Sequence, residues 1–530
     1  MASLEHKIHN IAEIINQCSV IGSGTPTRYH LKLREDLPNE YRPYRKCTFG
    51  ERNKDKPHKT ILMVGETGTG KTTLINVIIN YMLGVQREDK VWFEITDDQS
   101  DRTSVHSQTS SITVYGFYPQ ESPIHLTIVD TPGYGDTRSI EMDKEIALSL
   151  CSLIKSAEEV HEIHAVCLVV KATQNRLSDR QIYIFDAVQS LFGRDIAENI
   201  VLLFTYSSGT YPKDALTAIT EAKIKCAVNH KNQPVFFLFD NCQVQTPDEK
   251  YDEEYAEVHE QALEQSWNRS IRGGAIFFKF LESVKSKSLK MTQDVLQKQK
   301  QWHANICNLQ LRVKVIDKKQ NELKQTQEAL EQNKEYVKNN ENLEYEVDMV
   351  YKDKVDIDPS VAKAAMCCTV CEENCHCPGC WWAKNLSWCS MMKNNHCTVC
   401  TNKCHYSTHV KEAKIYETKK EKRTYEELKK KYEDKIRDGE SVVKKLEEEL
   451  QELQMEKVKL VMEAFHCVET LQIIALNVES LITLQHIDFL IEKLKEIKEP
   501  EKAKTLENIK KTAGGKKRIS RLHKRVSKKC

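Results

Sequence analysis

The chain has 530 residues, of which 40% are hydrophobic and 29% charged, and its formal net charge at pH 7 is +1. This length exceeds one ordinary domain, and the balanced charge excludes a polyelectrolyte partner recognised by global charge alone. No run of about 18 apolar residues occurs, so no membrane span is expected. Charged residues also interrupt residues 1–17, where a signal peptide needs an unbroken apolar core. We therefore expect a cytoplasmic protein of several parts.

Residues 1–57 form an N-terminal extension. It carries a short amphipathic segment near Ile8 to Ile15 and two candidate strands, YHLKLRED and RKCTFGE. We expect this extension to cover the domain that follows it.

A glycine-rich stretch, GETGTGKTT, lies between an apolar run, KTILMV, and an apolar-periodic segment, INVIINYML. A strand, a loop and a helix in this order let backbone N–H groups turn toward a phosphate at the positive end of the helix dipole. The spacing GxxxxGK[ST] assigns Lys71 to the terminal phosphates of a nucleotide and the hydroxyl of Thr72 to Mg²⁺. The predicted nucleotide-binding residues here are Gly65, Glu66, Thr67, Gly68, Thr69, Gly70, Lys71, Thr72 and Thr73.

A second apolar strand ends at Asp130 in the segment HLTIVDTPGYGDT. In P-loop nucleotidases an acidic residue at a strand tip holds Mg²⁺, so we expect Asp130 to share the metal with Thr72. The N–H of Gly133 is placed to sense a third phosphate. Between the two motifs, the segment VHSQTSSITVYGF offers Thr109 as the hydroxyl that completes the magnesium shell. The predicted catalytic set is Lys71, Thr109 and Gly133.

These two motifs, with the strand HAVCLVVKA and the segment QNRLSDRQIYIFDAVQSLFG, resemble the septin and GIMAP-like (AIG-type) branch of the P-loop GTPases. The resemblance covers about residues 55 to 285, and we place the G domain at residues 58–285. It implies an α/β Ras-like sheet with helices on both faces, GTP as the nucleotide, and self-association through the G domains.

The resemblance also implies where a guanine base is read. The segment VLLFTYSSGT contributes Thr205 and carries Ser208 where the family has a carboxylate. A later strand, VFFLFDNC, offers Asn241 as a base-side contact and Asp240 as a substitute acid. Tyr134 stands where fast Ras-type GTPases carry a glutamine that orients the attacking water. We therefore expect slow intrinsic hydrolysis that rises when a second G domain joins.

Ten of the 19 cysteines lie between Cys367 and Cys404, where CTVCEENCH recurs 29 residues later as CTVCTNKCH. Thiolates two residues apart bind tetrahedral zinc, and in a cytosolic chain such a cluster indicates metal rather than disulfides. We expect two structural Zn²⁺ ions, and the assignment of ligands to each ion stays open. The candidate ligands are Cys368, Cys371, Cys375, His376, Cys380, Cys389, Cys397, Cys400, Cys404, His405 and His409.

The C-terminal half is predicted to be helical around this cysteine-rich tip, residues 359–410. Apolar residues spaced by threes and fours predict coiled-coil arms at 286–358 and 411–463. Two such arms favour an antiparallel hairpin, with pairing to another molecule or a shorter bundle as alternatives. Residues 464–509 are more apolar and predict a helical bundle segment.

The tail, residues 510–530, carries ten Lys or Arg residues and no acid. It suits an anionic membrane surface or an acidic partner, and a plain solubilising role is the alternative. No specific nucleic acid is predicted.

Two functions follow from these patterns. The first is a GTP-binding protein and slow GTPase whose nucleotide state controls self-assembly, with a zinc-tipped helical stalk for partner contacts. The second is a nucleotide-binding scaffold with little or no hydrolysis.

Overall fold

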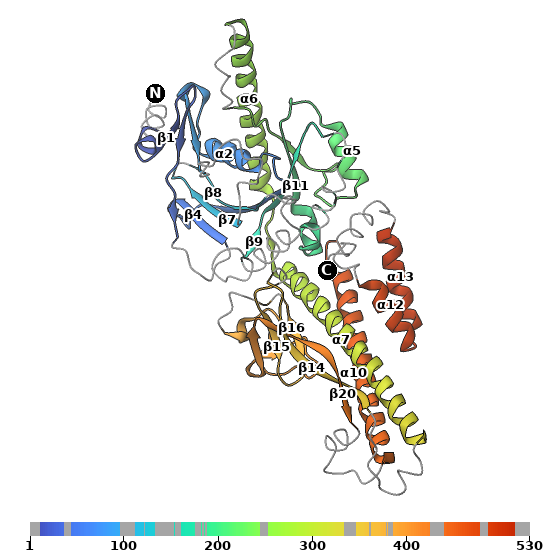
Figure 1. Ribbon diagram of the computed structural model, residues 1–530. Coiled ribbons are helices and arrows are strands. Elements are labelled where there is room, and N and C mark those ends of the chain that lie inside the picture. The colour runs from blue at the N-terminus through green and yellow to red at the C-terminus, as the bar shows by residue number, and fades with distance from the viewer. Residues whose placement is uncertain are drawn as a thin grey trace. The chain divides into compact units, whose positions relative to one another are not determined.

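The computed structural model describes residues 11–36, 44–95, 112–120, 122–132, 153, 161–174, 177, 182, 185, 188–243, 253–332, 346–359, 362–377, 379, 385–424, 439–477 and 486–514. These residues fall into two compact units (Figure 1). Unit 1 contains the described residues up to Val295 and a short piece that begins at Ile474. Unit 2 contains Leu296–Ile473 and the described residues after Ile482.

Unit 1 is built on an eight-stranded sheet with the order β12-β11-β10-β5-β8-β7-β4-β3. Strands β5, β8, β10, β11 and β12 are parallel, and β7 is antiparallel to β8. The expected α/β sheet is therefore confirmed. The strands are β3 (Arg34–Glu35), β4 (Tyr44–Gly50), β5 (His58–Gly65), β7 (Ile112–Tyr118), β8 (His125–Asp130), β10 (Ala165–Lys171), β11 (Ile200–Thr205) and β12 (Phe236–Leu238).

The central strands are almost continuously apolar because both faces of the sheet are covered. In β10 and β11 the described side chains are buried except Lys171. Helix α2 (Lys71–Met82) follows β5 and buries Leu74, Ile75 and Ile78 in the same core. This packing fixes the loop between β5 and α2 at the carboxyl edge of the sheet.

Helix α6 (Glu253–Ser283) packs close to the end of the sheet. A Cβ atom at Gly273 would lie 2.1 Å from the carbonyl oxygen of Leu238 in β12, so this approach requires a glycine. The ring centroids of Tyr81 and Phe278 lie 4.9 Å apart, which joins α2 to α6. A further helix of unit 1 is α5 (Lys213–Glu221), residues 11–16 are also helical, and 3₁₀ turns occupy Arg87–Asp89 and Arg194–Asn199.

The N-terminal extension takes part in the fold of the G domain. Strand β4, within the predicted RKCTFGE segment, pairs in parallel with β7, and β3 pairs with β4. A separate three-stranded sheet has the order β1-β2-β6, with bounds Ser19–Gly22, Thr27–His30 and Val91–Glu94. Strands β9 (Glu162–Ile163) and β13 (Lys287–Ser288) form a short pair.

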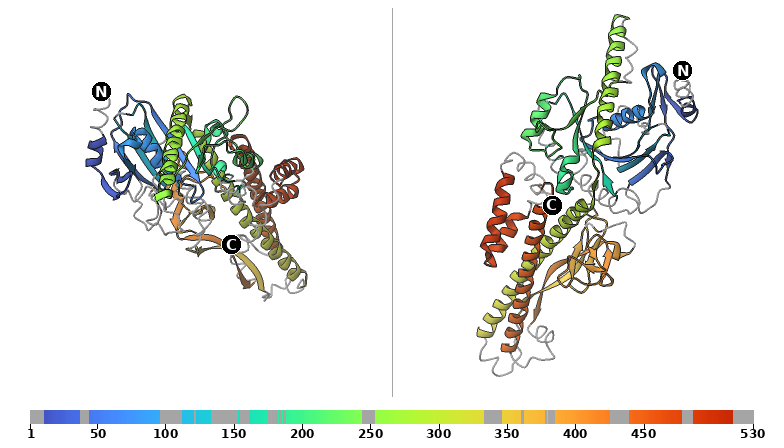
Figure 2. Two further views of the ribbon diagram at one scale, coloured as in Figure 1. Left: turned by 90° about the horizontal axis from the view of Figure 1, so that it is seen from above. Right: turned by 180° about the vertical axis from the view of Figure 1, so that it is seen from behind.

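Unit 2 contains two long helices, α7 (Lys290–Gln332) and α10 (Gly439–Ile474), which lie side by side in Figures 1 and 2. They run antiparallel, because Arg312 pairs with Glu456 at 2.8 Å and Lys319 with Glu449 at 2.9 Å. Helices α12 (Ile487–Glu496) and α13 (Pro500–Gly514) complete one apolar core. Its members include Trp302, Ile306, Leu460, Val468, Leu490 and Leu506.

The segments expected as continuous helical arms also contain strands. Strands β14 (Glu346–Asp356) and β20 (Lys414–Thr424) pair antiparallel along their full length. In EVDMVYKDKVD the residues Val347, Met349, Tyr351 and Val355 occupy alternate positions, which favours a strand. Among the described residues of the two arms, the helical spacing belongs to α7 and α10.

A cysteine-rich knot, residues 362–412, lies between β14 and β20 in the chain. Its three-stranded sheet has the order β16-β15-β19, with bounds Glu373–His376, Ala365–Cys368 and His409–Glu412. A short hairpin, β17 (Met392–Lys393) and β18 (His396–Cys397), and 3₁₀ turns at Leu386–Trp388 and Tyr406–Thr408 complete it.

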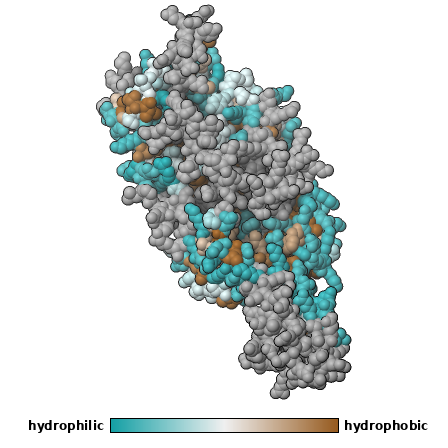
Figure 3. All heavy atoms as spheres, in the orientation of Figure 1, coloured by the Kyte–Doolittle hydropathy of each residue, from teal (hydrophilic) through white to brown (hydrophobic). Residues whose placement is uncertain are grey.

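Within the described residues, no helix is both long and apolar enough to cross a bilayer. On the face drawn in Figure 3, the described surface is mostly hydrophilic with small apolar patches.

Candidate functional site

The loop between β5 and α2 has the backbone that a phosphate site needs. Gly68 and Gly70 have φ angles of 79° and 81°, in the left-handed region that favours glycine. A Cβ atom at Gly70 would also lie 2.3 Å from the side-chain nitrogen of Asn241. The loop therefore turns tightly just before the first residue of α2, Lys71.

Lys71 lies inside this loop with 7% of its surface exposed. Its Nζ donates to the carbonyl oxygen of Gly65 at 3.0 Å and to that of Glu66 at 3.3 Å. Burial lowers the pKa of Lys71, and the negative charges of Asp130 and Glu66 oppose this shift. The ammonium group is thus held where the carboxyl ends of the strands meet.

Asp130 is the last residue of β8, and its register partner in β5 is Met63. Its exposed fraction is 1%, and its Oδ1 atom has no hydrogen-bond partner among the described residues. Burial raises the pKa of Asp130 to about 7, while Lys71 acts in the opposite direction. A buried acceptor oxygen without a donor suits a bound cation or its water shell.

Residues at the ends of β11 and β12 form hydrogen bonds with the backbone of the loop between β5 and α2. Thr205 donates its hydroxyl to the carbonyl oxygen of Thr69 at 2.7 Å, and Asn241 donates its amide to that of Gly70 at 2.8 Å. Both residues were expected beside the base, and the structure places them against the backbone of the loop. The Oδ1 atom of Asn241 has no hydrogen-bond partner among the described residues.

Asp240 is engaged by Arg269 of α6, whose Nη1 lies 2.7 Å from its Oδ2. Arg269 also donates to Gln265 at 2.8 Å. Ser208 is exposed, and its hydroxyl lies 2.8 Å from that of Thr210. Arg269 was not predicted from the sequence, because a single arginine in a long polar helix carries no motif.

The other predicted residues divide into two groups. Glu66, Thr67, Thr72 and Thr73 lie in the loop and the first turn of α2 and are partly exposed. Thr109, Gly133 and Tyr134 lie outside the described residues.

A glycine-rich loop before a helix, with a buried lysine and a strand-tip aspartate, defines the class of P-loop nucleotide-binding domains. Residues 59–259 match the model of the AIG1 family, so this stretch is an AIG1-type P-loop GTPase domain, as the motif resemblance predicted. No curated protein sequence matches the chain.

Solved structures of Toc33 from Arabidopsis thaliana are similar to part of the chain. A dimerization-deficient mutant of Toc33 is 12% identical with a TM-score of 0.25, and the match covers 41% of this chain and 86% of the Toc33 chain. Toc33 in complex with GDP and Mg²⁺ is 13% identical with a TM-score of 0.29, and that match covers 44% and 88%.

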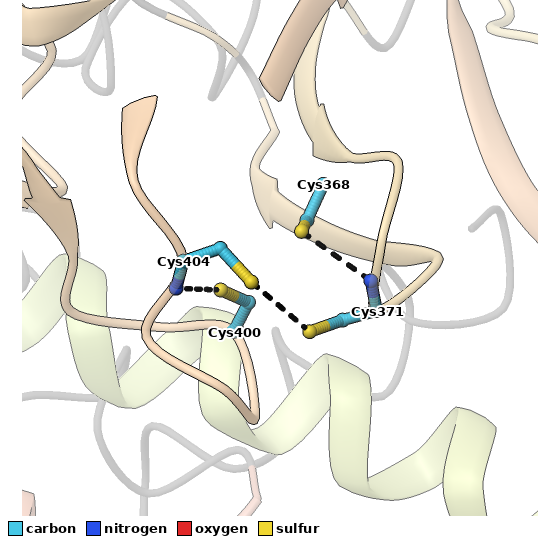
Figure 4. A group of neighbouring side chains, drawn as sticks. All are labelled: Cys368, Cys371, Cys400 and Cys404. Carbon is cyan, nitrogen blue, oxygen red and sulfur yellow. Dashed lines mark hydrogen bonds between the residues drawn. The ribbon is translucent and has the colours of Figure 1, made fainter. Parts of the chain in front are cut away.

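The cysteine-rich knot brings two groups of metal-ligating atoms together. Within each group these atoms all lie within 4.8 Å of one another. The first group is drawn in Figure 4 and contains Cys368, Cys371, Cys400 and Cys404. The second contains Cys375, Cys397, Cys400 and His409, all buried.

The thiols in these groups lie close enough to form hydrogen bonds with one another. Hydrogen bonds from the thiols of Cys371 and Cys400 lower the pKa of Cys368, and those from Cys375 and Cys400 lower the pKa of Cys397. The same hydrogen bonds raise the pKa values of Cys371, Cys375 and Cys400, so without a cation the thiolate charge rests on Cys368 and Cys397.

The other predicted ligands lie outside both groups. The Nδ1 atom of His376 and the Sγ atom of Cys389 form a separate pair at 3.2 Å. His405 is partly exposed, and its Nδ1 lies 2.9 Å from the hydroxyl of Ser407. Cys380 lies outside the described residues.

Proposed function

We propose that this chain binds GTP with Mg²⁺ in the loop Gly65–Thr73, hydrolyses it slowly, and associates with itself through its G domain in a nucleotide-dependent way. The observation that carries the proposal is the buried pair of Lys71 and Asp130, whose charges interact. Burying two ionisable groups lowers the stability of a fold. Such a pair is expected where a bound ligand interacts with both groups.

Each residue has a defined task in this proposal. The ammonium of Lys71 leaves its two carbonyl partners in the loop to contact the terminal phosphates. Asp130, in its charged form, and the hydroxyl of Thr72 hold Mg²⁺, which neutralises charge that develops on the phosphates. Thr109 and Gly133 would complete the metal shell and sense the third phosphate.

The residue at position 134 supports slow hydrolysis by the chain on its own. Tyr134 stands where fast GTPases have a glutamine that orients the attacking water. The chain on its own therefore lacks this glutamine at position 134. A second G domain that supplies a residue or orders Thr109 would raise the rate. Turnover per molecule is then expected to rise with protein concentration.

The choice of base is part of the proposal. Ser208 offers a hydroxyl, and Asp240 is paired with Arg269, so neither presents a free carboxylate to guanine. The AIG1 family match favours GTP. Competition between GTP and ATP for one site tests this choice.

The test measures Mg²⁺-dependent binding and single-turnover hydrolysis of GTP by the full chain. Lys71→Ala is compared with Lys54→Ala, because Lys54 is exposed and lies before β5. We expect the first variant to lose binding and the second to retain it. Absence of binding by the unmodified chain overturns the proposal, whereas binding without turnover favours the scaffold function.

The C-terminal half completes the proposal. We assign structural Zn²⁺ to the cysteine-rich knot, partner contacts to the helices that carry it, and contact with anionic membranes or an acidic partner to residues 510–530. Zinc is supported by the two thiol-rich groups, and membrane contact by the run of basic residues. Sedimentation with vesicles that contain phosphatidylserine, with and without residues 515–530, tests the tail.

A further inference from the structure

We infer that the cysteine-rich knot holds one dinuclear metal centre in which the thiolate of Cys400 bridges two divalent ions. This inference rests on the proposed zinc site and adds its nuclearity and ligand set. The sequence repeat suggested two separate sites, whereas the structure places Cys400 in both groups of ligands.

Among the described residues, the number of ligands favours a shared ligand. Two tetrahedral ions need eight ligand positions, and the two groups contain seven different side chains. A thiolate has lone pairs for two metals, so Cys400 supplies the eighth position. The two copies of the repeat interleave, because Cys368 and Cys371 of the first copy meet Cys400 and Cys404 of the second (Figure 4).

The spacing of the sulfur atoms fits a metal rather than a disulfide. The Sγ atoms of Cys371 and Cys404 lie 3.7 Å apart. Two thiolates on one tetrahedral zinc, each about 2.3 Å from the metal, lie about 3.8 Å apart. A disulfide would bring its sulfur atoms to about 2.05 Å. The separation of Cys371 and Cys404 therefore fits two ligands of one zinc ion.

His409 is set up as a ligand of the second ion. Its Nδ1 lies 3.1 Å from the carbonyl oxygen of His405, to which it donates, so Nε2 carries the lone pair. That Nε2 is buried without a conventional hydrogen-bond partner among the described residues, and the ring interacts with the thiols of Cys368 and Cys397. A metal-bound histidine commonly donates its other ring N–H to a backbone carbonyl in this way.

Backbone N–H groups point at the sulfur atoms. Cys371 N lies 3.4 Å from Cys368 Sγ, and Cys400 N lies 3.4 Å from Cys397 Sγ. The N–H of Cys404 donates to the bridging sulfur of Cys400 at 3.2 Å. Six thiolates outweigh the charge of two divalent ions, and these N–H groups offset the excess negative charge.

The position of Cys400 is fixed by the residue that follows it. Thr401 donates its backbone N–H to Glu373 at 2.8 Å and its hydroxyl to the same carboxylate at 2.6 Å. Glu373 in turn lies 3.2 Å from Arg312 of α7. Lys459 of α10 donates to the carbonyl oxygen of Thr401 at 2.8 Å. The bridging thiolate is thus anchored between the two long helices of unit 2.

The experiment adds Co²⁺ stepwise to the metal-free full chain and follows visible absorption and electron paramagnetic resonance. We expect two ions per chain in tetrahedral thiolate sites. The paramagnetic signal should grow with the first ion and fall well below the sum for two ions after the second, because a bridging thiolate couples their spins. Direct metal analysis of the chain as purified should give two zinc ions.

Each outcome decides between the proposals. Two ions with additive signals, or one ion per chain, would overturn the bridge and leave a zinc-binding knot. No bound metal would overturn the zinc assignment itself, while GTP binding would be unaffected. Cys404→Ser should remove one ion and restore an uncoupled signal, Cys400→Ser should disturb both, and Cys226→Ser in unit 1 is the matched control.

Discussion

The replacement Asp130→Asn should stabilise the empty G domain while it abolishes magnesium-dependent nucleotide binding. Burial raises the pKa of Asp130 from 3.8 to about 7. One pKa unit corresponds to about 1.4 kcal/mol, so the charged carboxylate costs the folded state up to about 4 kcal/mol at pH 8. Asparagine has nearly the same shape and carries no such cost.

The sign of the pH dependence follows from the same shift. The folded pKa of Asp130 lies above the unfolded value, so the carboxyl contributes its full stability below about pH 4. That stability is lost as the pH rises through the folded value of about 7. The gain from Asp130→Asn should therefore be about 1.6 kcal/mol at pH 5 and about 4 kcal/mol at pH 8.

Thermal unfolding of the full chain in magnesium-free and nucleotide-free buffer, at pH 5 and pH 8, measures this difference. We expect the midpoint of the G-domain transition to rise by several degrees at pH 8 in the variant. The exposed residue Asp214, replaced by asparagine, is the control and should show no change. Equal midpoints for variant and parent at pH 8, or intact Mg²⁺–GTP binding by the variant, would refute the reasoning.

Three further changes test other contacts. Asn241→Ala removes the amide that holds the loop, so the Kd for GTP should rise by up to about tenfold; an unchanged Kd would contradict this role. Gly273→Ala forces a Cβ against a carbonyl oxygen and should lower the unfolding midpoint more than Gly274→Ala does, whose new Cβ would meet a side chain. Arg312→Ala removes the cationic partner of the buried carboxylate of Glu373, which keeps its hydrogen bonds from Thr401, and should cost unit 2 up to about 3 kcal/mol. Replacing the exposed residue Lys324 by alanine should cost almost nothing.

The nucleotide loop could be predicted from the sequence because its chemistry is local. The glycines, Lys71 and the following helix lie close together in the sequence. The role of each follows from the backbone geometry of a strand, a loop and a helix. The position of Asp130 could also be predicted, because a strand followed by a turn places its last residue at the edge of a sheet. The contacts of Thr205 and Asn241 with the loop depend on the order of distant strands, which no short pattern records.

The structure of the C-terminal half could be predicted only in part from its sequence. Helical spacing correctly indicated long helices at α7 and α10. The alternation of apolar residues in β14, which favours a strand, was overlooked when the whole arm was predicted to be a helix. The cysteine repeat indicated pairs of thiols two residues apart. The meeting of Cys371 with Cys404 depends on the three-stranded sheet of the knot, so the grouping of ligands could not be read from spacing.

The N-terminal strands have a consequence for aggregation. Strand β7 would otherwise offer its free backbone groups to another chain, but β4 pairs along it and β3 pairs with part of β4. Strand β3 has two residues, Arg34 and Glu35, which are charged and exposed. A short charged edge is a poor template for a foreign strand, so β3 protects the part of β4 with which it pairs from edge-to-edge association.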